Sequence, residues 1–301
     1  MNNWKPSPAY QKVVEANRVW YAETAGWYNA TETCVIDARA QSEIEQDLDR
    51  VLGLLGKPPA EIRALDACGG SGNIAVKLHR RNVQVTLVDI SPELLDIFRK
   101  KCAQMEVEPH AVYAEIGFFL AQGNERFHLI VFSSALHHLE DVQGVLALAL
   151  PRLLPGGLLF TTFDSTAKER QRALTRFLLR VEYFFFKLFF QTLDVPKTAW
   201  RRIRRVASGA SPQDKQGVSL NAATAGMLAE YYGEKGIDDL ALVENLKEGG
   251  YEIVWHERYP GARFSWTRRM IAWLGDATSF KLLLRNPARD PGVARSPSGR
   301  E

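Results

Sequence analysis

The sequence contains few cysteines and no long hydrophobic run. The cysteines among its 301 residues are Cys34, Cys68 and Cys102, and three widely spaced thiols predict neither a disulfide framework nor a zinc site. No segment approaches the ~20 consecutive apolar residues of a membrane span, and the first residues lack the apolar core of a secretion signal. We therefore expect a cytoplasmic protein without a bound metal.

The sequence also lacks an even spread of charge. The net charge of the chain is only +3, but residues 165–210 contain eleven Lys and Arg against three Asp and Glu. This segment alone carries a net charge of +8, which leaves the rest of the chain negative. With 46% hydrophobic residues, a chain of this length can bury the core of one large or two modest domains.

A glycine-rich turn follows the first apolar strand pattern. Residues 65–73 read Leu-Asp-Ala-Cys-Gly-Gly-Ser-Gly-Asn, and a second apolar run ends at Asp89, 17 residues after Gly72. Without a Cβ, Gly70 and Gly72 let the backbone approach a ligand closely, and the helix that begins near Gly72 points free N–H groups at it. A carboxylate about 20 residues further on is the usual partner of ribose hydroxyls. The two features together predict a site for a cofactor that contains adenosine.

Two kinds of adenosine cofactor fit this pattern. Residues 70–75 also satisfy a looser dinucleotide signature, so an NAD(P)-dependent oxidoreductase is one alternative. Asp66 argues against it, because a carboxylate at the strand end repels a pyrophosphate and attracts the ammonium group of an amino-acid moiety.

Residues 64–73 resemble the D-x-G-x-G-x-G motif of class I S-adenosylmethionine-dependent methyltransferases, of the type that acts on small molecules. Cys68 stands where that family usually has its first glycine, so it has to adopt backbone angles that a Cβ tolerates. Further segments follow in the order of the family, at residues 87–89, 112–116, 127–139 and 153–160. The resemblance covers residues 61–164 well and residues 236–285 loosely.

The resemblance implies S-adenosylmethionine as the cofactor and residues around it. Asp89 would hold the ribose, Glu115 and the backbone of Ile116 the adenine edge, and Tyr28 would fold over the cofactor. The implied cofactor-binding residues are Tyr28, Asp66, Cys68, Gly69, Gly70, Gly72, Asp89, Ile90, Glu115, Ile116 and Ser133.

Two adjacent histidines, His137 and His138, follow the predicted fourth strand, at the edge of the sheet where ligands lie in folds of this kind. A histidine titrates near neutral pH and can act as a general base. The same dipeptide is widespread in the family whatever the substrate, so a structural or cofactor-covering role stays open beside the catalytic one.

Alternating strand and helix patterns predict an α/β fold, a doubly wound, seven-stranded and mostly parallel sheet of the Rossmann-like methyltransferase type with an inserted helical cap. We expect strands near residues 62–67, 83–89, 110–115, 127–133, 157–163, 251–255 and 279–284. The expected divisions are an N-terminal helical cover (1–60), the cofactor-binding core (61–164), a helical insertion or substrate cap (165–235), the end of the core sheet (236–285) and a disordered tail (286–301).

The predicted insertion contains a basic and aromatic helix. Arg172, Arg176 and Arg180 recur every fourth residue, and phenylalanines occupy much of the remaining helix surface. Three roles stay open for this surface: packing on the core, lining the substrate chamber, or contact with a membrane surface through residues 169–193. We do not expect nucleic-acid binding, because the basic residues lack aromatic platforms on which bases stack.

The expected reaction is methyl transfer from S-adenosylmethionine to a small acceptor, which releases S-adenosylhomocysteine. The phenylalanines of the insertion favour an apolar or aromatic acceptor, as in secondary metabolism. Besides the oxidoreductase, a catalytically inactive partner protein that binds the same cofactor is an alternative. The sequence does not distinguish methylation of oxygen, nitrogen or carbon, and it leaves the oligomeric state open.

Overall fold

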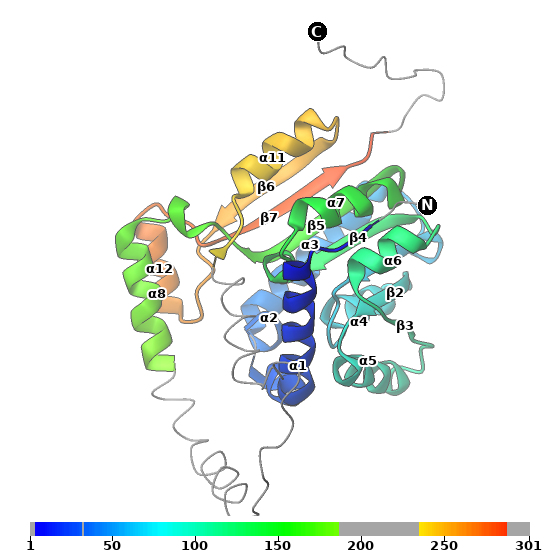
Figure 1. The fold of residues 1–301 in the computed structure, drawn as a ribbon, viewed down its shortest axis with the longest axis horizontal. Helices are drawn as coiled ribbons and strands as arrows, with labels where there is room; N and C mark the ends of the chain where they lie inside the picture. The colour runs from blue at the N-terminus through cyan, green and yellow to red at the C-terminus, as the bar shows by residue number, and fades with distance from the viewer. Residues whose placement is uncertain (1–3, 32, 187–234, 288–301) are drawn as a thin grey trace, which may run out of the picture.

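A single seven-stranded sheet forms the centre of the protein (Figure 1). The computed structural model describes residues 4–31, 33–186 and 235–287. The strand order is β3-β2-β1-β4-β5-β7-β6; β1 to β5 run parallel, and β7 runs antiparallel to both of its neighbours. The strands are β1 (Arg63–Ala67), β2 (Gln84–Asp89), β3 (His110–Tyr113), β4 (Phe127–Ser133), β5 (Leu153–Ser165), β6 (Glu252–Tyr259) and β7 (Ser279–Arg285). The predicted fold class is confirmed.

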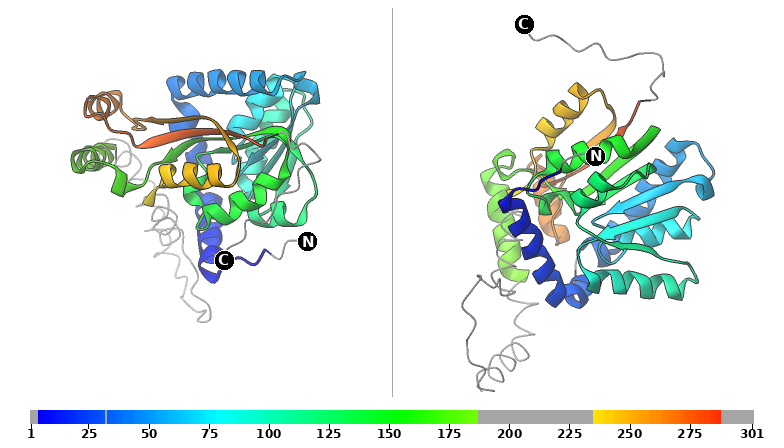
Figure 2. Two further views of the ribbon diagram at one scale, coloured as in Figure 1. Left: turned by 90° about the horizontal axis from the view of Figure 1, so that it is seen from above. Right: turned by 45° about the vertical axis from the view of Figure 1, so that its right-hand side comes forward.

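Helices cover both faces of this sheet (Figure 2). One buried apolar cluster joins the sheet to α3, α4 and α5, and a second joins its other face to α6, α7, α11 and the first turn of α1. The helices are α1 (Pro8–Thr31), α2 (Thr33–Ile36), α3 (Ala38–Leu55), α4 (Asn73–Arg80), α5 (Pro92–Gln104), α6 (Ile116–Gln122), α7 (Val142–Ala149), α8 (Ala173–Phe186), α11 (Asp239–Glu248) and α12 (Ser265–Trp273). None of these described helices is long and apolar enough to cross a membrane.

Local sequence accounts for several helix ends. Helix α5 begins where Ser91 accepts a hydrogen bond from the Leu94 N–H at 3.2 Å, with a proline in the first turn. Helix α3 begins at Asp37, whose carboxylate accepts from the Ala40 N–H at 2.9 Å, and ends at Gly56, which adopts a left-handed φ of 60°.

Three strands have a boundary that differs from the prediction by two residues or more. Strand β3 ends at Tyr113 because Glu115 already caps the following helix, accepting from the backbone of that helix. Strand β6 extends to Tyr259 because its pairing with β7 continues as far as Ser279. Strand β5 begins at Leu153, four residues earlier than expected.

Helices α8 and α12 stand beside the sheet and pack against each other (Figure 1). Helix α12 lies between β6 and β7 in the chain. Most of the predicted insertion, residues 187–234, and most of the predicted tail, residues 288–301, lie outside the described residues. Asn286, at the start of that tail, is bonded through its N–H to the Gly157 carbonyl at 2.8 Å.

Candidate functional site

The glycine-rich turn between β1 and α4 leaves no room for a side chain at Gly69 or at Gly72. A Cβ on Gly72 would lie 2.2 Å from the Phe98 ring, and one on Gly69 would lie 2.7 Å from the Asp66 carboxylate. Gly70 and Gly72 have φ values of 54° and 78°, in the left-handed region that glycine adopts at little cost. The predicted need for glycine is therefore explained by both packing and backbone angle.

Cys68 shares this left-handed conformation, with a φ of 56°. A residue with a Cβ can adopt this small left-handed region, in line with the expectation, but only at a cost in free energy. The cost for a residue with a Cβ is about 1–2 kcal/mol. Burial raises the pKa of the Cys68 thiol, so the side chain stays protonated at neutral pH.

Asp89 fastens the turn to the end of β2. Its carboxylate accepts hydrogen bonds from the N–H groups of Gly70 and Ser91, both at 2.8 Å. Burial raises its pKa to about 6, opposed by these backbone bonds. The side chain is therefore mostly ionised at neutral pH and holds the two strand ends together.

Asp66 lies beneath the turn. One of its oxygens accepts from the Ala75 N–H at 2.9 Å, and the other is buried without a hydrogen-bond partner among the described residues. Complete burial raises its pKa to about 7. An unpartnered buried carboxylate oxygen costs free energy, and it fits a cationic group arriving at this point.

A small cavity of about 80 Å³ lies in front of the turn, and we call it the turn cavity. Seven of the predicted residues line it: Cys68, Gly70, Asp89, Ile90, Glu115, Ile116 and His138. Asp66, Gly69, Gly72, Ser133 and His137 do not line it, although Ser134 does. The Tyr28 side chain lies outside the described part of the chain.

Helix α1 closes the turn cavity. A helical cover was expected over residues 1–60, but the residues of α1 that line the cavity were not predicted. Val14, Asn17 and Tyr21 line it from α1, and the Tyr21 hydroxyl lies 3.4 Å from the His138 Nε2. The Tyr10 hydroxyl donates to Glu115 at 2.5 Å. A ligand site usually spans roughly 300 Å³ or more, so the turn cavity must widen to admit a nucleoside.

Glu115 is already engaged in this closed arrangement. Its two oxygens accept from the N–H groups of Gly117 and Phe118 at 2.7 and 2.8 Å, which caps α6. Because Oε1 accepts from both Tyr10 and Gly117, a new ligand contact at this oxygen requires that α1 gives way, whereas Oε2 accepts from Phe118.

The two histidines have different surroundings. His138 lines the turn cavity, and burial lowers its pKa well below 6.5, so the imidazole is neutral at pH 7. His137 points its Nδ1 at the buried carboxylate of Asp164, 2.9 Å away, and lines another cavity of about 530 Å³. The Thr161 hydroxyl donates to the other oxygen of Asp164 at 2.5 Å. The two imidazole rings pack at a centroid distance of 4.2 Å.

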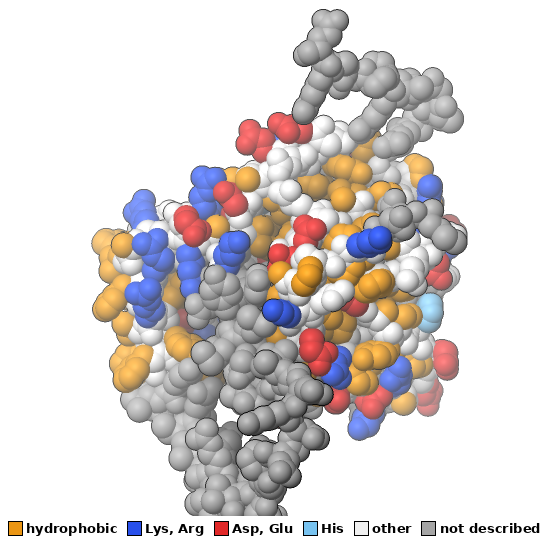
Figure 3. Space-filling view, in the orientation of Figure 1, with side chains coloured by type: hydrophobic (Ala, Val, Ile, Leu, Met, Phe, Trp, Pro, Cys, Tyr) orange, Lys and Arg blue, Asp and Glu red, His pale blue; other side chains and the backbone are white. Residues whose placement is uncertain are grey.

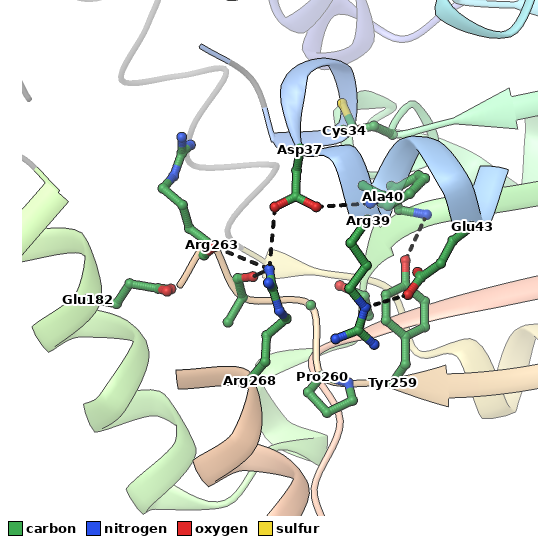
Figure 4. A pocket seen from close by; sticks show the side chains of 15 residues that line it. Cys34, Asp37, Arg39, Ala40, Glu43, Glu182, Tyr259, Pro260, Arg263 and Arg268 are labelled. Carbon is green, nitrogen blue, oxygen red and sulfur yellow. Dashed lines mark hydrogen bonds and ion pairs between the residues drawn. The ribbon is translucent and has the colours of Figure 1, made fainter. Parts of the chain in front are cut away.

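A larger cavity of about 300 Å³ adjoins the turn cavity, since Ser134 lines both. Figure 4 shows the residues that line this larger cavity. We call it the charged cavity. Its walls come from α3, the ends of β5 and β6, α8 and α12, and its charged lining residues are Asp37, Arg39, Glu43, Glu182, Arg263 and Arg268. Glu182 is the one lining residue from α8 among the described residues.

The charged groups of this cavity are partly paired. Arg39 bonds to Glu43 at 2.7 Å, whereas Arg268 and Asp37 are 3.9 Å apart, too far for a direct hydrogen bond. The Arg268 Nη1 donates to two backbone carbonyls, and its buried Nε has no partner among the described residues. None of these residues was predicted, because α3 is far from β6 and α12 in the sequence.

A protein-family model described as a methyltransferase domain matches residues 36–195. The tRNA 5-carboxymethoxyuridine methyltransferase of Escherichia coli (strain K12) is 33% identical over 128 residues, which cover 41% of this chain and 47% of that protein. The ubiquinone biosynthesis O-methyltransferase of Xanthomonas axonopodis pv. citri (strain 306) is 26% identical over 125 residues, 42% of this chain and 51% of that protein. The chain thus spans about half the length of these curated relatives.

The fold also resembles solved structures. The N-methyltransferase NodS from Bradyrhizobium japonicum WM9, in complex with S-adenosyl-L-homocysteine, superposes with a TM-score of 0.52 at 13% identity. The match covers 89% of this chain and 99% of that one. At this identity the likeness concerns the fold alone.

Proposed function

We propose that this protein methylates a small polar acceptor held in the charged cavity. The premise is that the chain belongs to the class I S-adenosylmethionine-dependent methyltransferases. The observation that carries the proposal is the shared wall at Ser134, which joins the charged cavity to the predicted cofactor site. An acceptor and the donor methyl group must meet, and adjoining cavities allow this.

The residues present fit S-adenosylmethionine, which when bound supplies an electrophilic methyl group. Asp89 and the backbone of Gly70 lie at the edge of the turn cavity where a ribose would bind. The unpartnered oxygen of Asp66 is suited to the ammonium group of the methionine portion. The other predicted cofactor contacts, including Tyr28 and Ser133, stay predictions.

We propose that α1 is the cover that opens for the cofactor. The turn cavity is too small for an adenosyl group while Tyr10 bonds to Glu115 and Tyr21 lies against His138. Closure of α1 after binding would exclude water from the reacting methyl group, which methyl transfer requires.

The lining of the charged cavity supports a polar acceptor over the apolar or aromatic one that the Phe-rich segment suggested. Among the described residues, that segment contributes only Glu182 to the wall. The named relatives act on a modified tRNA base and in ubiquinone biosynthesis. The acceptors to be tested therefore include tRNA. A cytoplasmic location and a role in secondary metabolism stay predictions.

If the acceptor has to lose a proton, we propose His138 as the base. It borders the turn cavity, and its lowered pKa keeps the imidazole unprotonated at neutral pH. His137, held by Asp164, would position the His138 ring that packs against it.

The experiment is calorimetry with S-adenosylhomocysteine, followed by a screen for transfer of a labelled methyl group to small polar acceptors and to tRNA. Asp89→Asn should weaken cofactor binding about tenfold or more, because an amide replaces the acceptor for two backbone N–H groups and the ribose. Asp96→Asn, a change to an exposed carboxylate on α5, is the matched control and should leave binding unchanged.

Two outcomes would contradict the proposal. Binding of NADPH without binding of S-adenosylhomocysteine would favour the oxidoreductase. Cofactor binding without transfer to any acceptor, together with intact biological output in His138→Ala, would favour the inactive partner protein.

A further inference from the structure

Helices α8 and α12 form an antiparallel pair beside the sheet, and we call this pair the side lobe. At one end the Arg172 N–H donates to Asp276 at 2.8 Å, and at the other the Phe264 N–H donates to Glu182 at 2.5 Å. Leu178 of α8 packs against Ile271 of α12 along the buried seam. The seam uses only one side of each helix, so the opposite sides face outward.

The outward side of the lobe is apolar and aromatic. Phe177 is 59% exposed, Phe184 is 62% exposed and Trp273 is 85% exposed. Other exposed apolar side chains of the two helices are Leu174, Tyr183, Phe185, Trp266 and Met270. A helix on the surface of a soluble domain normally turns its polar side to water. A cluster of exposed apolar side chains on this scale marks an interaction surface.

Arginines surround these aromatic residues. Residues 172–186 and 263–276 contain six arginines against two acids. Arg263 and Arg268 line the charged cavity, whereas Arg172, Arg180 and Arg269 are exposed. Figure 3 shows Lys and Arg side chains among hydrophobic ones over the edge of the molecule where α8 and α12 lie. The lobe is therefore both apolar and positively charged, while the chain as a whole is nearly neutral.

We propose that the side lobe docks on the surface of an anionic lipid bilayer. Exposed Phe and Trp side chains enter the boundary between headgroups and acyl chains, and arginines pair with lipid phosphates. This inference goes beyond the methyl-transfer reaction, because the lobe's outward side takes no part in the cofactor contacts.

Nucleic acid is the less favoured partner for this surface. RNA binding needs a basic groove with aromatic platforms, whereas here exposed apolar side chains such as Phe177, Phe184 and Trp273 lie on two helices. Exposed apolar side chains gain more from insertion into lipid than from contact with a hydrated phosphate backbone.

The test is flotation of the full chain with vesicles. We expect binding to vesicles of equal phosphatidylglycerol and phosphatidylcholine, at least tenfold less binding to pure phosphatidylcholine, and release in 1 M KCl because salt screens the arginines. The double variant Phe177→Ser/Phe184→Ser should lose about tenfold or more in binding. The double variant Leu54→Ser/Leu240→Ser, which removes exposed leucines on α3 and α11, is the matched control and should bind as wild type.

A second readout does not depend on those variants. The Trp fluorescence of the wild-type protein should shift to the blue on adding phosphatidylglycerol vesicles, and Trp273→Phe should remove most of that shift. Equal flotation of the Phe double variant and the wild type, or no flotation with anionic vesicles, would overturn the proposal. Binding of tRNA that competes with vesicles and depends on Phe177 and Phe184 would instead assign the surface to RNA.

Discussion

The turn cavity and the charged cavity differ in how the fold brings their lining residues together. The turn cavity is built by consecutive strand ends, where Gly70, Asp89 and Glu115 follow β1, β2 and β3 in order. The charged cavity combines α3, the ends of β5 and β6, α8 and α12, with Asp37 opposite Arg268, more than 200 residues away in the chain. In the proposed assignment, cofactor recognition uses mainly residues at successive strand ends, whereas acceptor recognition depends on elements that only the tertiary fold brings together.

The largest expected effect comes from a substitution in the glycine-rich turn beside the turn cavity. Gly72→Ala should destabilise the protein by about 2–4 kcal/mol and abolish cofactor binding, because its Cβ meets Phe98 at a φ of 78°. Urea unfolding and calorimetry measure the two effects. Gly53→Ala, in the last turn of α3 with nothing within 4 Å of the added Cβ, is the control and should not destabilise. Normal cofactor binding by the Gly72 variant would show that the turn is not the cofactor site.

A substitution at Asp66 should change stability and cofactor binding in opposite directions. Its pKa is raised to about 7 in the folded protein, so the proton is bound more tightly there than in the unfolded chain. Burial therefore costs stability progressively as pH rises from about 4 to about 7. Asp66→Asn should stabilise the ligand-free protein by about 2–4 kcal/mol at pH 8, with little effect at pH 4, and should weaken cofactor binding. Denaturation at the two pH values measures the change in unfolding free energy that Asp66→Asn causes. An equal change at both pH values would contradict the prediction.

A substitution at His138 tests whether this residue acts as a base in methyl transfer. His138→Gln should lower kcat about 100-fold for an acceptor that must lose a proton, with little change in cofactor affinity. His137→Gln should have a smaller effect, because that ring bonds to Asp164 and does not line the turn cavity. Profiles of kcat against pH would distinguish a base from a packing role, and an unchanged kcat in His138→Gln would exclude the base.

A substitution at Arg268 tests whether the charged cavity binds the acceptor. Arg268→Gln should raise KM for the acceptor about tenfold and leave the cofactor Kd unchanged, because Arg268 lines only the charged cavity. Arg269→Gln changes the next residue, whose exposed side chain lies outside that cavity, and should leave KM as it is. A change in cofactor Kd with no change in KM would assign the charged cavity to the cofactor instead.

The same contrast explains what the sequence could predict. Alternating patterns and the motif order placed all seven strands and seven of the residues in the turn cavity, since each lies beside a strand end. Helix α1 was expected as a cover, but Asn17 and Tyr21 carry no local signal that distinguishes a cavity wall from ordinary packing. Arg268 and Asp37 belong to separate segments, and only the packing of α12 near α3 brings them together.

The most direct test is a crystal structure with bound S-adenosylhomocysteine. The account predicts the ribose at Asp89, the ammonium group near the free oxygen of Asp66, the sulfur directed toward Ser134 and α1 displaced from its contacts with Glu115 and His138. Density for the ligand elsewhere, with Asp89 and Glu115 bonded as they are here, would contradict it.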